Sequence, residues 1–411
     1  MEILLLALAL LPPPQEPPLE KAARDVAARI EAYPRDLEDL FHESFLRQVP
    51  ATQLEALLGQ FHQKHGKVTS VTLLSRDLET SARFSFAFEK GVRMRVTVTV
   101  AAGPSPKIVG LWFAPAAPDC RSIEEALEGM RKLPGAVSFR LARLGEKIEP
   151  LHDLNPDAPL AIGSTFKLYI LAALLEDRRP WDEILRLKPE LMSLPSGELQ
   201  TWPEGAPLTV HSLATLMISK SDNTATDHLL HHAGRGRVEA LMGPLGNAQP
   251  ERSRPFLSTL EMFKLKSDPA LMKKYLEADG KVRREILAGP VRQVPRARAA
   301  PYAAPTAIDR LEWFASAADL CRLMDWFRKK DDPAVSAILA VNPGLDIPRD
   351  RFPYAGYKGG SEPGVLNLTW LLKAADGTAY GLSAGWNNPE KALDEQKFFG
   401  LVQSVICLTA K

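Results

Sequence analysis

The segment Ile162–Leu175, IGSTFKLYILAALL, places a serine and a lysine at the start of an otherwise apolar, helix-spaced run. Ser164 and Lys167 are three residues apart, so their side chains lie on one face of a helix's first turn. Burial lowers the pKa of a lysine, and a neutral amine can accept the proton of a serine hydroxyl. The pair therefore predicts an activated nucleophile.

The pair alone also fits a structural explanation, in which Ser164 caps the helix and the stem of Lys167 lies along its apolar surface. Ordinary residue usage gives about one or two such serine–lysine spacings by chance in a chain this long. Two further segments favour the catalytic interpretation. Ser221–Asn223 (SDN) begins another apolar helix, and Lys358–Ser361 (KGGS) enters a predicted strand.

In order, spacing and context, these motifs resemble S-x-x-K, S-D-N and K-[ST]-G of the class A β-lactamases and related penicillin-binding proteins. The first two motifs begin 57 residues apart (221 − 164). The resemblance covers about 120–411. It implies a β-lactamase/transpeptidase-like fold, in which an antiparallel sheet flanked by helices joins strands from both ends of the segment and an all-helical subdomain is inserted between them.

The resemblance implies a catalytic role for three residues. Ser164 is expected to attack the substrate and form an acyl-enzyme, and Lys167 is expected to accept its proton. Ser221 is expected to pass a proton to the leaving group. Asp222, which lies between Ser221 and Asn223 in the second motif, is expected to face inward and act structurally.

Four further residues are expected to bind the substrate. Asn223 would hydrogen-bond the substrate or the lysine, and Lys358 would attract a substrate carboxylate. Gly360 and Ser361 belong to the substrate-binding strand, and the backbone N–H of Ser361 would form an oxyanion hole with that of Ser164.

Two departures from the family pattern bear on the activity. Gly359 stands where the family has Ser or Thr, so a hydroxyl contact to the substrate carboxylate is lost unless Ser361 replaces it. The E-x-x-L-N segment that carries the deacylating Glu is also missing. Glu261 begins EMFKL without the Asn, and Glu312 is a weaker candidate.

The expected function is therefore acyl transfer on a β-lactam or a related small-molecule ester or amide. An esterase or peptidase with weak β-lactamase activity stays open. So does a penicillin-binding or sensing protein that is acylated without efficient turnover. A catalytically dead scaffold has no reason to keep a costly buried Lys167 beside Ser164. No cofactor and no metal are expected, and the oligomeric state is open.

The rest of the chain of 411 residues predicts further parts. Residues 1–18 contain a short apolar run and a Pro-rich spacer, which favours an export signal over a buried N-terminal segment and predicts no stable membrane span after processing. Residues 19–117 predict a small α+β domain, with helices over 20–33, 37–49 and 51–66 followed by antiparallel strands. Lys plus Arg number 51 and Asp plus Glu 50, so the charge balance gives no reason to expect a nucleic acid.

Several side chains outside the motifs have an open role. The resemblance places Cys120 and Cys407 near paired first and last helices, where they could form a disulfide in an exported protein. Cys321 is expected to be a buried structural thiol. The histidines of HLLHH, from His228 to His232, favour a surface helix end over a metal site. Arg292, Arg296 and Arg298 either attract an anionic substrate at the site mouth or, as we favour, lie on a solvated loop.

Overall fold

The computed structural model describes residues 17–31, 36–103, 106–114, 117–118 and 120–409. The expected export signal and spacer (1–18) lie outside the described residues except for the last two positions, where the first helix begins. The chain divides into two compact units, Met1–Cys120 and Arg121–Lys411. Among the described residues, no helix has both the length and the apolar character needed to cross a bilayer.

The N-terminal unit is built from helices followed by an antiparallel sheet, as the sequence predicts. Its elements are α1 (Pro18–Glu31), α2 (Glu43–Leu46), α3 (Ala51–His65), β1 (Val68–Leu78), β2 (Ser81–Phe88), β3 (Val92–Val100), β4 (Ile108–Phe113) and β5 (Ala117–Pro118). The strands are ordered β1-β2-β3-β4, with β5 paired to β3. In β3 every second residue from Met94 to Val100 is buried, which produces the apolar face that α1 covers.

The helix predicted over 37–49 is wrong in extent, since only the four residues of α2 are helical. Backbone hydrogen bonds from His42 N to Ile108 O and from Ile108 N to Leu40 O draw this segment to the edge of β4. Tertiary pairing therefore replaces the first turns of the expected helix. Helix α3 ends as expected at Gly66, whose φ of 80° favours glycine.

The C-terminal unit has one principal antiparallel sheet that joins strands from its two ends, as the resemblance implies. The order is β12-β13-β14-β6-β7. These strands are β6 (Ala136–Leu144), β7 (Ile148–Leu154), β12 (Tyr354–Glu362), β13 (Val365–Lys373) and β14 (Ala379–Asn387). The Asp376-Gly377 turn connects β13 and β14, with Gly377 at a φ of 86°.

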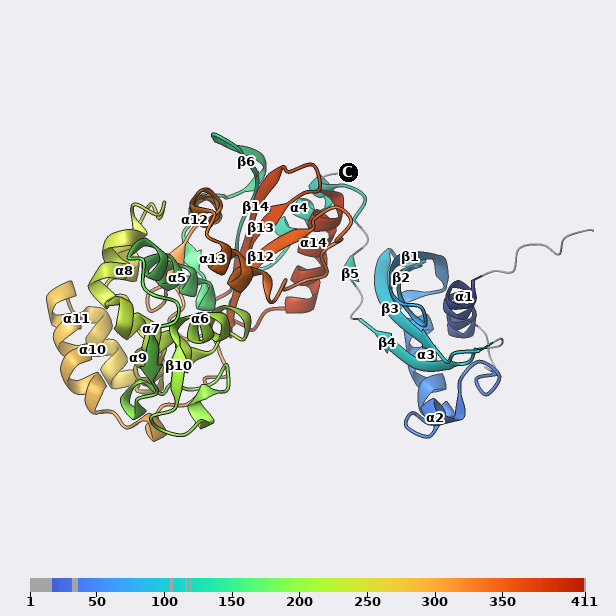
Figure 1. The fold of residues 1–411 in the computed structure, drawn as a ribbon, viewed down its shortest axis with the longest axis horizontal. Coiled ribbons are helices and arrows are strands. Elements are labelled where there is room, and N and C mark those ends of the chain that lie inside the picture. Colours follow the sequence, from blue (N-terminus) through green and yellow to red (C-terminus); the bar gives the residue numbers. More distant parts are fainter. Residues whose placement is uncertain (1–16, 32–35, 104–105, 115–116, 119, 410–411) are drawn as a thin grey trace, which may run out of the picture. The chain divides into compact units, whose positions relative to one another are not determined.

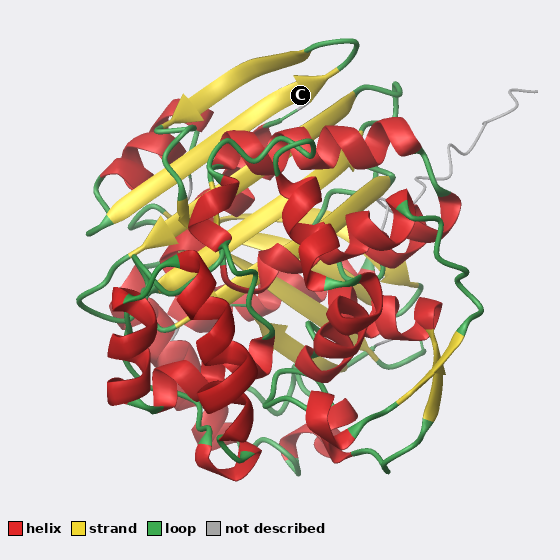
Figure 2. Ribbon diagram, turned by 90° about the vertical axis from the view of Figure 1, so that its left-hand side faces the viewer, coloured by secondary structure: helices red, strands yellow, loops and turns green. Residues whose placement is uncertain are grey.

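Helices cover this sheet and form a separate helical part (Figures 1 and 2). They are α4 (Ile123–Arg131), α5 (Lys167–Glu176), α6 (Val210–Ser219), α7 (Asn223–Ala233), α8 (Arg235–Met242), α9 (Thr259–Ser267), α10 (Pro269–Glu277), α11 (Gly280–Ile286), α12 (Ala317–Lys330), α13 (Pro333–Ala340) and α14 (Glu395–Leu408). Short strands β9 (Ile184–Arg186), β10 (Pro207–Thr209) and β11 (Phe314–Ala315) interrupt the all-helical subdomain that the resemblance implies, and β8 (Leu160–Ala161), which pairs with β11, precedes α5.

Two helix contacts position the site. Helix α5 is apolar on all sides from Leu168 to Leu174 and is buried at the centre of the helical core. The first and last helices of the unit, α4 and α14, pack together as expected, with Gly129 against Leu401. Cys407 on α14 is a free thiol whose Sγ accepts a hydrogen bond from Gln403 Nε2, so the disulfide hypothesised with Cys120 is not formed.

Candidate functional site

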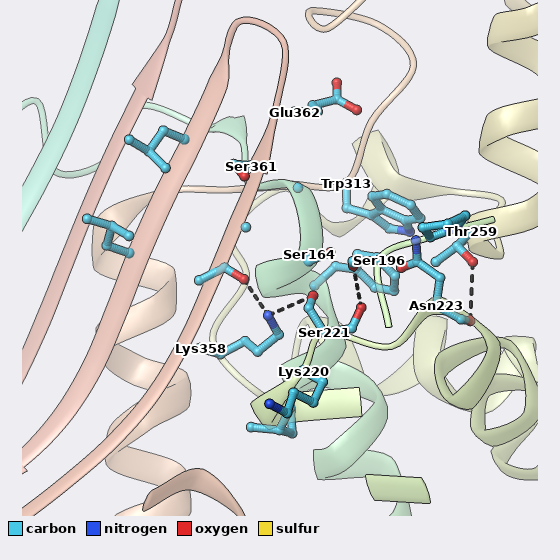
Figure 3. Close-up of a pocket in the computed structure, with 18 of the residues that line it drawn as sticks. Ser164, Ser196, Lys220, Ser221, Asn223, Thr259, Trp313, Lys358, Ser361 and Glu362 are labelled. Carbon is cyan, nitrogen blue, oxygen red and sulfur yellow. Dashed lines mark hydrogen bonds between the residues drawn. The ribbon is translucent and has the colours of Figure 1, made fainter. Parts of the chain in front are cut away.

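The three sequence motifs meet at one cavity of about 530 Å³ in the C-terminal unit (Figure 3). Ser164 lies in the 3-10 turn Gly163–Phe166 that leads into α5. Ser221 and Asn223 lie at the start of α7. Lys358–Ser361 lies in the second half of β12, rather than at its entry as predicted, because β12 already begins at Tyr354.

Lys167 is fully buried and is held by the second motif. Its Nζ donates to Ser221 O at 2.7 Å, Ser221 Oγ at 3.1 Å and Asn223 Oδ1 at 2.7 Å. Desolvation, reinforced by the positive charge of Lys358, holds the pKa of Lys167 well below its usual range. These contacts orient an amine that can exist in its neutral form.

Ser221 Oγ bridges two lysines, because Lys358 Nζ donates to it at 3.1 Å from the opposite side. The Lys358 ammonium also donates to Gly359 O. Burial lowers the pKa of Lys358 to about 7. A hydroxyl that accepts from both amines keeps its own proton available for a group in the cavity.

The side chain of Ser164 lines the same cavity, and within the described part of the chain its hydroxyl makes no hydrogen bond. Strand β12 approaches its backbone closely at Gly360. A Cβ placed on Gly360 would lie 2.6 Å from Thr165 N and closer still to Ile162 O and Ser164 N. The absence of a side chain therefore lets the amides of Ser164 and Ser361 lie near one another.

The solved structures to which this chain is similar include PBP-A, with 17% identity over 70% of this chain and 94% of that chain, at a TM-score of 0.47. A β-lactamase from Sphaerobacter thermophilus shares 18% sequence identity over 70% of this chain and 94% of that chain, at a TM-score of 0.47. A β-lactamase from Chitinophaga pinensis shares 15% sequence identity over 70% of this chain and 98% of that chain, at a TM-score of 0.48. Among curated proteins, none matches the chain.

Residues 121–284 match the model of the β-lactamase enzyme family. The matched segment includes the first two motifs and ends before the third. The C-terminal unit has a β-lactamase-like fold.

Asp222 is fully buried and supports the local backbone, as expected. Its Oδ1 accepts from Ala225 N at 2.8 Å and thereby caps α7. Its Oδ2 accepts from Glu198 N at 2.7 Å and Leu199 N at 3.0 Å. The carboxylate thus joins the loop before α6 to the start of the helix that carries Asn223.

Tyr357 is a site residue that the sequence analysis missed. A Cβ placed on Gly359 would overlap Tyr357 Oη, so this phenol occupies the space of the side chain that the family carries there. The ring is packed against Trp370, with centroids 4.7 Å apart. Within the described residues its hydroxyl has no hydrogen-bond partner, although it lines the cavity. Burial raises the pKa of Tyr357, so the phenol remains a donor at neutral pH.

The two glutamates considered for deacylation do not line the cavity that contains Ser164. Glu261 accepts from Arg235 Nη2 at 2.6 and 2.8 Å and from Ser258 N at 2.8 Å, in the capping box of α9. Glu312 is buried and paired with Lys266. Burial raises the pKa of Glu312 well above its usual range. Neither arrangement supplies a base to the acyl group.

Glu362, at the end of β12, is the one carboxylate among the described residues that line this cavity. Lys266 Nζ donates to its Oε1 at 2.7 Å, and the hydroxyl of Tyr302 donates to its Oε2. Both carboxylate oxygens are therefore engaged by protein donors. The adjacency of Glu362 to the third motif is the only sequence signal for this residue, and Lys266 lies 96 positions away.

Other expectations have mixed outcomes. Cys321 is fully buried as expected, and burial raises the pKa of its thiol to about 12.

The surface position expected for His228 is wrong. Its Nδ1–H donates to Thr224 O and its Nε2 accepts from Lys188 N, both at 2.8 Å, which makes it a neutral, buried, structural histidine. Among the described residues, no group of three or more His, Cys, Asp or Glu could hold a metal ion.

Proposed function

We propose that this protein is a serine acyl hydrolase that forms an acyl-enzyme on Ser164, with β-lactams or related esters and amides as substrates. The observation that carries the proposal is the position of the fully buried Lys167. Its amine contacts Ser221 and Asn223 at the cavity into which Ser164 opens. A buried lysine without an ion-pair partner is costly, and the ability of its neutral amine to accept a proton from a serine explains its retention.

In the proposed reaction, Ser164 Oγ attacks the substrate carbonyl carbon as its proton passes to the Lys167 amine. The backbone N–H groups of Ser164 and Ser361 would stabilise the developing oxyanion. As the C–N or C–O bond breaks, Ser221 Oγ–H gives its proton to the leaving atom. The proton held by Lys167 then replaces it through their 3.1 Å hydrogen bond. Asn223 holds the lysine and is available to the substrate amide.

We propose slow deacylation as the second feature of this function. Water must attack the acyl-enzyme, which requires a base near the ester. Glu362 is the one candidate carboxylate among the described lining residues, and both of its oxygens already accept hydrogen bonds. This favours a protein in which a penicillin adduct persists. Export, which residues 1–18 predict, remains a proposal.

Intact-protein mass spectrometry after addition of benzylpenicillin tests the proposal. We expect an adduct of the mass of the whole penicillin on the wild type and none on Ser164→Ala. A long-lived adduct supports acylation with slow deacylation, and a transient adduct with released product shows efficient β-lactamase activity. An equal adduct on both proteins, or none on either with penicillins and activated esters alike, contradicts the assignment of Ser164.

We also propose that Tyr357 Oη and Lys358 Nζ together recognise the substrate carboxylate. Tyr357→Phe is expected to lower kcat/KM for acylation by benzylpenicillin about tenfold, since a hydrogen bond to a charged group is lost. The methyl ester of the same penicillin should be affected by less than about threefold. Stopped-flow acylation rates measure both values.

Tyr354→Phe is the matched control for this variant. Tyr354 lies on the same strand, but its hydroxyl donates to Ser336 O at 3.1 Å and does not line the cavity. Tyr354→Phe should leave the ratio of the acylation rates with benzylpenicillin and with its methyl ester unchanged. If Tyr357→Phe slows acid and ester equally, the phenol does not contact the carboxylate.

A further inference from the structure

A second cavity, of about 850 Å³, lies in the helical part of the C-terminal unit. Helix α9 separates it from the cavity of Ser164. Met262 and Phe263 line the first cavity, whereas Leu260 and Lys264 line the second. Its apolar lining comes from several elements: Leu191, Leu230, Leu260, Leu287 and Val291. Among the described residues, the two cavities have no lining residue in common. The second cavity can therefore bind a ligand of its own.

Most charges in the second cavity are already satisfied within the protein. Arg235 is paired with Glu261 at 2.6 Å, and Arg284 is paired with Glu239. Asp227 accepts hydrogen bonds from the backbone N–H groups at the start of α9, at 2.7 and 2.9 Å. These groups have no unmet requirement for a ligand.

Lys264 differs from them, because its side chain is largely buried and only the carboxylate of Glu261, which is already paired with Arg235, acts on its charge from a distance. The residue is 8% exposed, and its Nζ donates only a long hydrogen bond of 3.4 Å to Arg292 O. Among the described residues it forms no ion pair, although buried cations are normally paired. A lysine without an ion pair at a cavity wall can attract an anionic ligand.

The two arginines of the adjoining segment add to this positive charge. Arg292 and Arg296, which the sequence analysis considered for the mouth of the active site, are exposed and instead line the second cavity. Neither forms an ion pair with a described carboxylate. Opposing them, Glu190 and Asp227 are the acidic residues of the lining without an ion-pair partner among the described residues, which leaves three unpaired cations against two carboxylates. The net unpaired charge of the cavity is therefore positive.

We propose that this cavity binds an organic anion with an apolar body. The anionic group would contact Lys264, Arg292 and Arg296, and the apolar body would lie on the leucine and valine side chains. Such a ligand supplies an ion-pair partner for Lys264 and removes apolar surface from water. The site is independent of the reaction proposed for Ser164.

Isothermal titration calorimetry with decanoate tests this site, with decanol as the uncharged probe. Decanoate is expected to bind at one site, and decanol at least about tenfold more weakly. Lys264→Met should raise the Kd for decanoate about tenfold or more. The double variant Arg292→Gln/Arg296→Gln changes only exposed side chains, so it should stay folded and also weaken binding.

Two control variants test whether a change in the Kd for decanoate is specific to the proposed site. Lys273→Met removes a lysine on α10 that is 76% exposed, and it should leave the Kd unchanged. Ser164→Ala should also bind decanoate normally, because the proposed site does not include the nucleophile. No decanoate binding, equal binding of decanol, or an unchanged Kd in both the Lys264 and the arginine variants would overturn the proposal.

Discussion

Replacement of Lys167 by methionine is expected to lower the acylation rate with benzylpenicillin by about 10³-fold, within the range for loss of a general base. Methionine matches the length of the buried lysine stem, so the packing around α5 should be kept. The two acceptors Ser221 O and Asn223 Oδ1 lose their partner, which costs about 1–3 kcal/mol of stability for each one left without a hydrogen bond. Loss of the buried positive charge offsets part of this cost.

The pH profile of the same variant distinguishes a base from a structural lysine. In the wild type, Lys167 must be neutral to accept a proton, so kcat/KM should rise with pH while this amine loses its proton. The ammonium of Lys358 has a pKa of about 7 because of burial, so contact with the substrate carboxylate should weaken above that pH. In Lys167→Met, the rise of kcat/KM with pH should disappear, whereas the fall of kcat/KM above pH 7 should remain.

Stopped-flow acylation over pH 5–9 measures both effects, and thermal melting confirms that the variant is folded. The exposed lysine variant Lys273→Met should match the wild type in rate and profile. A folded Lys167→Met protein that acylates within tenfold of the wild type would show that another group accepts the proton of Ser164.

Gly360→Ala is expected to damage both stability and acylation. The added Cβ would lie 2.6 Å from Thr165 N and nearer to two other backbone atoms, Ile162 O and Ser164 N. Backbone atoms cannot swing away as a flexible side chain can, so β12 and the turn of Ser164 must separate. We expect a loss of about 2–3 kcal/mol in the free energy of unfolding, as for overpacked cores. Acylation should fall about 10²-fold, the scale of a lost oxyanion contact.

Urea unfolding and acylation kinetics test this expectation together. Gly236→Ala is the matched control, because a Cβ at this position in α8 meets no atom within 4 Å. Alanine there should be neutral or stabilise the helix by up to about 1 kcal/mol. If Gly360→Ala were as stable and as active as the control, close approach of β12 to Ser164 would not be needed.

Local sequence patterns predict much of this protein. Alternation of apolar residues in β3 predicts its buried face, and Gly66 predicts the end of α3. The order of Ser164, Lys167, Ser221 and Lys358 predicts a β-lactamase-like domain with these residues at one site. These signals depend on side-chain spacing and turn chemistry over a few residues, or on motif order, which can be read without knowledge of the packing.

The tertiary structure alone decides which distant groups meet. Tyr357 gives no signal in the sequence, yet packing against Trp370 places its hydroxyl in the space left by Gly359. Glu362 meets Lys266 from 96 positions away, and α9 separates Lys264 from the cavity of Ser164. Such contacts depend on how complete elements pack, because burial and the neighbouring charges set the chemistry of each group and neither is encoded in local spacing.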